Sequence, residues 1–117
     1  MRPVVLPFLL LAGTALLAGD PTRDLPRLQG GDLQKYWGDV CARCHGVAGN
    51  GRDNGGRPLP DQGFDFTDSR KANRRKDSDW VNIILAGREK MPAFKDRLTP
   101  DNAQRMTVIL RKFSAKS

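Results

Sequence analysis

The sequence has few of the side chains that bind metal ions or act as nucleophiles. Its 117 residues include two cysteines, Cys41 and Cys44, and one histidine, His45. A structural zinc site usually takes four Cys or His ligands, so these three residues would need an added carboxylate. A long apolar run is also missing. The most apolar stretch, residues 4–18, would extend about 22 Å as a helix at ~1.5 Å per residue, short of a hydrocarbon core of about 30 Å.

The three scarce side chains lie together in the pentapeptide Cys41-Ala42-Arg43-Cys44-His45. The spacing C-x-x-C-H is typical of covalent attachment of a c-type haem. On a helix, residues three and four positions apart share one face, so both thiols and the imidazole would point the same way. The thiols could then add to the two vinyl groups of the haem, with the imidazole on the iron between them.

Other interpretations of this motif are weaker. A thioredoxin-like dithiol would need a surrounding βαβ pattern, and no strand-rich flanks are visible. A zinc site would be one ligand short. The glycine-rich stretch that follows, residues 46–63, lacks the Lys-Ser or Lys-Thr pair and the preceding strand of a phosphate-binding loop. With His45 on iron, no Ser-His or Cys-His nucleophile remains, so we expect no enzyme activity.

The first nineteen residues have the pattern of a secretory signal. Arg2 supplies a positive start, the apolar stretch follows, and small residues precede the polar Asp20. No cysteine directly follows that stretch, which excludes a lipid anchor on cysteine. We therefore predict that residues 1–19 are removed, and that the mature protein is periplasmic with no membrane span. Removal lowers the formal net charge from +7 to +6.

The rest of the chain is long enough for one domain. Residues 20–31, which contain two prolines and two glycines, are predicted to be an extended N-terminal tail, and residues 32–117 the domain. Cap residues and apolar spacing predict three helices. They run from an N-cap at Asp32 into the haem motif, from Asp77 or Ser78 to Gly87, and from Thr99-Pro100 to about Phe113.

Basic residues outnumber acidic ones, 20 against 13. The segment Arg70–Lys76 holds five cations in seven residues. An exported protein meets no genome, so we expect no nucleic-acid partner. The charge serves either docking to acidic protein surfaces or solubility alone.

Taken together, residues 30–113 resemble a class I monohaem cytochrome c of the small bacterial exported type. The resemblance implies an all-α cytochrome c fold, with three main helices and long Gly/Pro-rich loops wrapped around one covalent haem c. Its most specific feature is a Met-Pro-x-Phe element between two helices, downstream of the haem motif. The residues that carry it are Cys41–Gly46, Gly49, Gly51, Asp65-Phe66-Thr67-Asp68, Gly87 and Met91-Pro92-Ala93-Phe94.

The resemblance implies a set of haem ligands. Cys41 and Cys44 match the thioether cysteines, His45 the proximal iron ligand and Met91 the distal one. The residues themselves support Met91, because a single histidine excludes bis-histidine ligation within a monomer. Met106, the other methionine after residue 19, lies on an apolar helical stripe where core packing is expected.

Three further positions are implied in haem binding. The carbonyl of Pro58 would accept the proton of His45 Nδ1, with Pro60 as the alternative. Leu59 and Phe66 would line the pocket.

The sequence departs from the family pattern at the crossing of the terminal helices. Leu33 stands where the family often has glycine, eight residues before the first cysteine. Ile109 takes the place of an aromatic residue in the last helix, unless Phe113 has that role.

The implied function is electron transfer, with the iron cycling between Fe(II) and Fe(III). His/Met ligation raises the reduction potential because the thioether favours the ferrous state. The implied partners are redox proteins (a dehydrogenase, an oxidase or another cytochrome) with acidic docking surfaces. The alternative is a haem enzyme subunit, or a protein that binds peroxide or NO at an open iron site. A free carrier and a fixed subunit are not distinguished by sequence.

Overall fold

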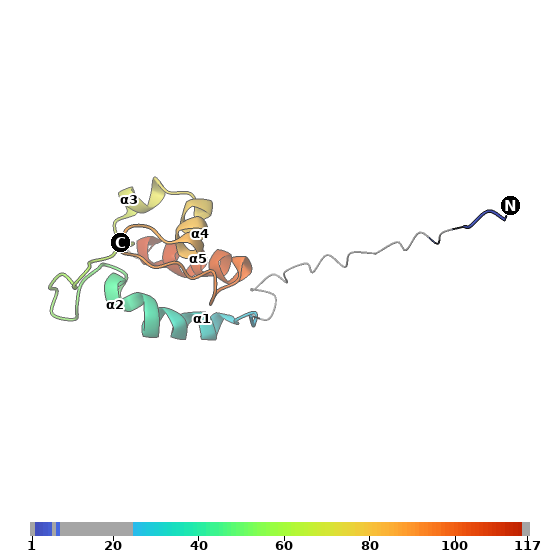
Figure 1. Cartoon of the computed structure of the whole chain (residues 1–117). Coiled ribbons are helices and arrows are strands. Elements are labelled where there is room, and N and C mark those ends of the chain that lie inside the picture. Colours follow the sequence, from blue (N-terminus) through green and yellow to red (C-terminus); the bar gives the residue numbers. More distant parts are fainter. Residues whose placement is uncertain (1, 6, 8–24, 116–117) are drawn as a thin grey trace.

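The structure, a computed structural model, describes residues 2–5, 7 and 25–115. Within these ranges the regular secondary structure is helical, with two isolated β-bridges and no strand (Figure 1). This confirms the predicted all-α fold. Most of the predicted export segment, residues 1–19, lies outside the described ranges. Among the helices that are described, none combines the length and the apolar character needed to cross a membrane.

The first helical rod leads directly into the C-x-x-C-H motif. It consists of α1 (Gly30–Tyr36), the π-helical turn η1 (Trp37–Cys41) and α2 (Ala42–His45). The predicted N-cap was wrong: Gln29 caps α1, and its backbone N–H donates to Asp32 Oδ2 at 3.0 Å. Asp32 therefore lies at the third helical position, where an acidic side chain reaches back to the cap.

Three more helices follow the glycine-rich loop. The short α3 was not predicted, because only one of its five residues, Ala72, is apolar and no helical stripe can be recognised. The second predicted helix begins at Asp77, a residue expected to be its cap or to precede the cap. As predicted, Gly87 ends the helix, and its φ is 76°. The last helix begins at the predicted proline. Their bounds are α3 Ser69–Asn73, α4 Asp77–Ala86 and α5 Pro100–Ala115.

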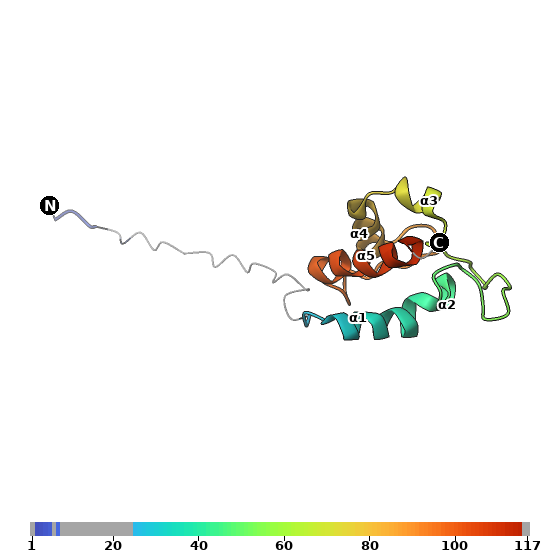
Figure 2. The same cartoon turned by 180° about the vertical axis from the view of Figure 1, so that it is seen from behind.

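Helix α5 is the centre of the packing. It contacts α1, α3 and α4, and it lies between α1 on one side and α3 with α4 on the other (Figures 1 and 2). The buried side chains that form the shared core come from all of these elements and from the loops between them. The largest contributors are Leu33, Trp37, Phe66, Trp80, Ile84, Phe94, Leu98, Met106, Ile109 and Leu110.

The contacts between the first and last helices show how the chain accommodates both departures from the family pattern. The rings of Trp37 and Phe113 lie 5.0 Å apart, so Phe113 supplies the aromatic contact from the last helix. Gly49 of the glycine-rich loop packs on the same ring, since a Cβ there would meet Phe113 at 2.7 Å. Leu33 is 1% exposed and fills the core at the position where glycine was expected.

The segment before α1 is held against α5. The buried Asn102 side chain accepts a hydrogen bond from Leu28 N at 3.0 Å and donates one to the Pro26 carbonyl at 3.1 Å. An amide buried in this way is stable only because both of its polar atoms are paired. The chain is thus fixed from Pro26 onward, which sets the entry of the helix that carries the motif.

Candidate functional site

The end of the first helical rod presents the two thiols and the imidazole. Cys41 is the last residue of η1, and Cys44 and His45 end α2. All three side chains are half-buried, and neither cysteine forms a disulfide. Gly46 then turns the chain out of the helix with φ 76°, a conformation that favours glycine. The motif is therefore at a helix terminus, with the loop folded directly over it.

His45 is oriented by the backbone of a later segment. Its Nδ1 lies 3.2 Å from the carbonyl oxygen of Phe64. A carbonyl only accepts, so Nδ1 carries the proton in this hydrogen bond and Nε2 keeps its lone pair. Burial lowers the pKa of the His45 imidazole, and the bond to Phe64 partly opposes that change. The ring is thus neutral near pH 7 and has a free nitrogen available to a metal.

The predicted partner of His45 was wrong. Pro58, and Pro60 as its alternative, were expected to supply the carbonyl, but Pro58 forms a β-bridge with Arg52 instead. The segment after the prolines lies against the motif because Gly63 N donates to the Cys44 carbonyl at 2.7 Å. That bond brings the next carbonyl, of Phe64, to the histidine.

Gly63 is a site residue that sequence reasoning missed. A Cβ at this position would lie 2.4 Å from His45 Nδ1, closer than real Cβ atoms approach another heavy atom. Only glycine therefore lets the backbone reach the imidazole ring. Its place directly before the alternating Phe64 and Phe66 is the feature of the sequence that could have indicated it.

Aromatic rings surround the imidazole. The centroid of His45 lies 5.0 Å from that of Phe66 and 5.8 Å from that of Trp37. Phe66, predicted to line the pocket, is buried and also contacts Trp80 edge-on at 5.3 Å. Leu59, the other predicted lining residue, is half-buried and is not part of the packed core of the described residues.

Met91 is held in a tight turn between α4 and α5. Arg88 N donates to the Met91 carbonyl at 3.0 Å, and Met91 N donates back to the Arg88 carbonyl at 2.9 Å. Glu89, within this turn, has φ 52°, a costly conformation for a residue other than glycine. The Met91 side chain is half-buried and packs against the core. Met106 is 2% exposed within α5, in the core position expected for it.

The donor set fits a haem better than the alternatives. Among the described residues, no group of three His, Cys, Asp or Glu side chains could hold a metal ion, which argues against zinc. The cysteines are unpaired, and burial raises the pKa of the Cys41 thiol to about 11, so it is a neutral thiol and not a reactive thiolate. Half-buried thiols, a neutral imidazole and aromatic surroundings suit a large apolar macrocycle.

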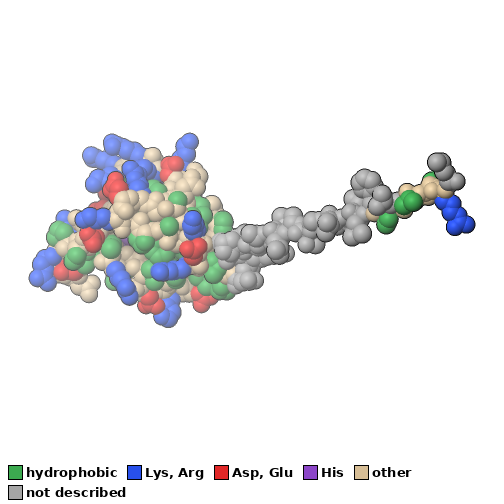
Figure 3. All heavy atoms as spheres, in the orientation of Figure 1, with side chains coloured by type: hydrophobic (Ala, Val, Ile, Leu, Met, Phe, Trp, Pro, Cys, Tyr) green, Lys and Arg blue, Asp and Glu red, His purple; other side chains and the backbone are tan. Residues whose placement is uncertain are grey.

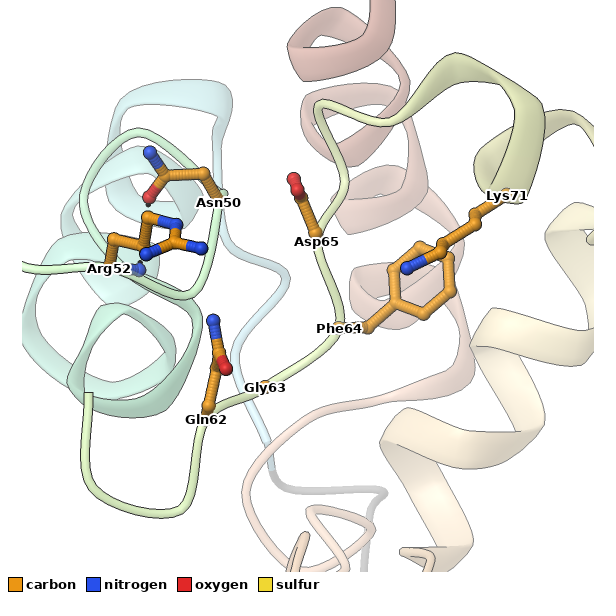
Figure 4. A pocket seen from close by; sticks show the side chains of 7 residues that line it. All are labelled: Asn50, Arg52, Gln62, Gly63, Phe64, Asp65 and Lys71. Atoms are coloured by element: carbon orange, nitrogen blue, oxygen red, sulfur yellow. Dashed lines mark hydrogen bonds between the residues drawn. The ribbon is translucent and has the colours of Figure 1, made fainter. Parts of the chain in front are cut away.

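A polar groove lies along the segment that holds His45. Its volume is about 390 Å³, and it opens between the glycine-rich loop and α3 (Figure 4). None of the residues that the sequence predicted for the site lines it. Its lining includes Gly63 and Phe64, which contact His45, so the groove is adjacent to the motif. The lining residues are Asn50, Arg52, Gln62, Gly63, Phe64, Asp65 and Lys71.

This helical fold, with C-x-x-C-H at the end of its first rod, is that of a class I monohaem c-type cytochrome, a haem-based electron-transfer protein with covalently bound haem c. More specifically, the chain belongs to the family described as cytochrome c oxidase, cbb3-type, subunit III, whose model matches residues 29–108. It is also similar to a solved structure, the KustC0563 c-type cytochrome. The two share 25% identity over 68% of this chain and 94% of that one, with a TM-score of 0.57. No curated protein matches.

Proposed function

We propose that this protein is an exported electron carrier in which His45 and Met91 are the axial ligands of a haem attached to Cys41 and Cys44. When bound, the haem supplies one-electron chemistry between Fe(II) and Fe(III). The observation that carries the proposal is the contact of His45 Nδ1 with the Phe64 carbonyl, because it leaves Nε2 unprotonated. The chain's own residues orient that ligand and place the rings of Trp37 and Phe66 beside it.

The case for Met91 rests on its surroundings. Two backbone hydrogen bonds hold Met91 in a turn that contains a strained Glu89. The backbone of Met91 is therefore fixed, and its side chain packs against the core. Such strain persists where the surrounding structure requires it, often at functional sites. The other methionine of the domain, Met106, is occupied in the core. A thioether ligand favours the ferrous state and would give the carrier a high potential.

Redox proteins with acidic surfaces are the proposed partners, and the surface over α3 supports this. Four exposed cations, Arg70, Lys71, Arg74 and Lys76, form what we call the α3 patch. Figure 3 shows lysine and arginine side chains gathered over this helix. The neighbouring Asp68 caps α3, and its carboxylate also lies 4.0 Å from the ammonium group of Lys71. Export to the periplasm is proposed from the sequence pattern of residues 1–19.

Carbon monoxide binding separates the carrier from a small-ligand protein. We expect the purified, reduced holoprotein to bind carbon monoxide slowly or not at all, because Met91 fills the sixth position. The Met91→Ala variant should bind it rapidly. Rapid binding by the wild type, at the rate of the variant, would favour the open-iron alternative.

A second candidate function is that of a fixed subunit in a respiratory oxidase. The observation in its favour is the family description, which names subunit III of a cbb3-type oxidase. Chemical cross-linking in intact cells, followed by purification through a tag at the C-terminus, distinguishes the two. A constant stoichiometric complex with oxidase subunits identifies a fixed subunit, and recovery as a single chain identifies a free carrier.

A further inference from the structure

One ion pair joins the two segments that hold the proposed axial ligands. Lys90 Nζ donates to Asp61 Oδ1 at 3.0 Å, across 29 positions of the sequence. Lys90 directly precedes Met91, in residues 87–92, which we call the Met91 turn. Asp61 begins residues 61–64, which we call the proximal segment. Among the residues that the structure describes, no other hydrogen bond connects the two segments.

The proximal segment is fixed on the haem motif. Gly63 N donates to the Cys44 carbonyl at 2.7 Å, and the Phe64 carbonyl lies 3.2 Å from His45 Nδ1. Asp61 precedes these contacts by two and three residues. Its backbone therefore has a defined position relative to the imidazole, and its carboxylate is a fixed point to which another segment can attach.

The Met91 turn is attached to α4 at both ends. Gly87 N and Phe94 N donate to carbonyls of that helix at 2.8 and 2.9 Å. Between these attachments the turn carries Lys90 and Met91 as neighbours. An opening of the turn that withdraws Met91 from the iron therefore also withdraws Lys90 from Asp61. The ion pair opposes such an opening.

Backbone strain is found at both ends of the ion pair. Asp61 has φ 51°, and Glu89, the neighbour of Lys90, has φ 52°. Glycine apart, no other described residue has a positive φ. These conformations cost free energy and persist where the surrounding structure requires them, often at functional sites. The strain coincides with the contact between the two segments, which supports a role for that contact in placing them.

We propose that Asp61 and Lys90 are positioning residues whose ion pair slows the release of Met91 from the haem iron. The inference rests on the proposed function, and it adds two residues that neither ligate iron nor attach the haem. Both side chains are exposed, and an exposed ion pair contributes little to global stability. Opening of one turn needs much less free energy than unfolding, so the same contribution changes the opening rate about two- to fivefold.

The binding of imidazole to the ferric holoprotein tests the proposal. At saturating imidazole the rate is limited by departure of the sixth ligand, so it measures opening of the Met91 turn. Asp61→Asn removes the charge and keeps a residue type that tolerates a positive φ. Lys90→Gln removes the charge of the partner. We expect each variant to bind imidazole about two- to fivefold faster than the wild type at low salt, with an unchanged midpoint of urea unfolding.

A double variant and a control separate the ion pair from general charge. The variant with both Asp61→Asn and Lys90→Gln should bind imidazole no faster than either single variant, because each already lacks the pair. Salt at about 0.5 M should bring the wild-type rate close to that of the variants, since it screens exposed charges. Arg88→Gln is the matched control and should keep the wild-type rate. It removes an exposed cation of the same turn that forms no ion pair within the described part of the chain.

Failure of this inference is distinguishable from failure of the proposed function. If the wild type shows the far-red absorption of methionine-ligated ferric haem and the single variants bind imidazole at its rate, only the role of the ion pair is overturned. Additive effects in the double variant, equal acceleration by Arg88→Gln, or a parallel loss of global stability would overturn it too. If the wild type lacks that absorption, the proposed ligation itself fails, and the inference fails with it.

Discussion

The guanidinium of Arg111 lies 4.0 Å from the centroid of the Trp80 ring. The same group donates to the Asp77 carboxylate at 2.8 Å and to the Ala72 carbonyl at 2.8 Å. One side chain of α5 therefore holds α3, through its Ala72 carbonyl, and α4, through its Trp80 ring. Because Trp80 packs on Phe66, which packs on the histidine of the motif, this contact supports the wall of the haem site.

Replacing Arg111 should destabilise the whole helical core. Arg111→Met removes a cation–π contact and charge-assisted hydrogen bonds, and we expect the free energy of unfolding of the holoprotein to fall by about 2–3 kcal/mol. Lys112→Met is the matched control, since the next residue is exposed and should change stability by less than about 0.5 kcal/mol. Urea denaturation measures both, and equal losses would show that the Arg111 contacts contribute nothing specific.

Gly63 should tolerate no side chain. In Gly63→Ala the added Cβ would meet His45 Nδ1 at 2.4 Å, so either the imidazole or the loop must move. We expect a reduced yield of haem-loaded protein and a loss of stability of about 1–3 kcal/mol, as for overpacking of a core.

Gly38→Ala is the matched control for that substitution. Gly38 lies in the helical rod, and a Cβ there would meet nothing within 4 Å. Alanine at this position should be neutral or stabilising by about 0.4–1 kcal/mol, because it restricts the unfolded chain. If the two variants gave the same haem yield, the close approach of Gly63 to the histidine would not matter for haem attachment.

The two methionines of the domain should respond differently to the same substitution. Met91→Leu should abolish the far-red absorption of the ferric haem and lower the reduction potential, because leucine offers no ligand. Met106→Leu conserves volume in the core and should leave the absorption in place, with a stability change below about 1.5 kcal/mol. Optical spectra of both variants decide the assignment, and the reverse outcome would move the sixth ligand to α5.

Association with an acidic redox protein should depend on the α3 patch. Attraction between exposed charges is screened over roughly 8 Å at physiological ionic strength and affects association rates more than binding strength. Arg74→Glu should therefore slow electron transfer at low salt and flatten its salt dependence. Lys35→Glu is the control, since Lys35 lies on α1, on the other side of α5, and pairs with Asp39 (Figure 1). If both substitutions changed the rate of electron transfer and its salt dependence equally, the α3 patch would have no role beyond solubility.

The sequence predicted those parts of the fold that depend on local residue types. The C-x-x-C-H motif, the helix stop at Gly87 and the start of α5 at Pro100 follow from spacing and cap chemistry, and the structure agrees with them. The all-α fold with one covalent haem was predicted from a family resemblance that also rests on local motifs. These features need no knowledge of which segments meet in space.

What the sequence left undetermined depends on contacts between distant residues. The carbonyl beside His45 comes from Phe64 and not from Pro58, because a backbone bond from Gly63 to the motif selects that segment. The hydrogen bonds of η1 span five residues, and no pattern of side chains in the sequence indicates such a π-helical turn. Arg111, one cation among many in the sequence, is distinguished only by the ring and carbonyls that converge on it.

The central claim is that Cys41 and Cys44 hold the haem by covalent bonds. Its most direct test is the intact mass under denaturing conditions after expression with a haem-attachment system. We predict that the wild type keeps the added mass of one haem, and that a variant carrying both Cys41→Ser and Cys44→Ser has the mass of the polypeptide alone. A wild-type chain that loses all haem on denaturation, despite expression with that system, would contradict the account.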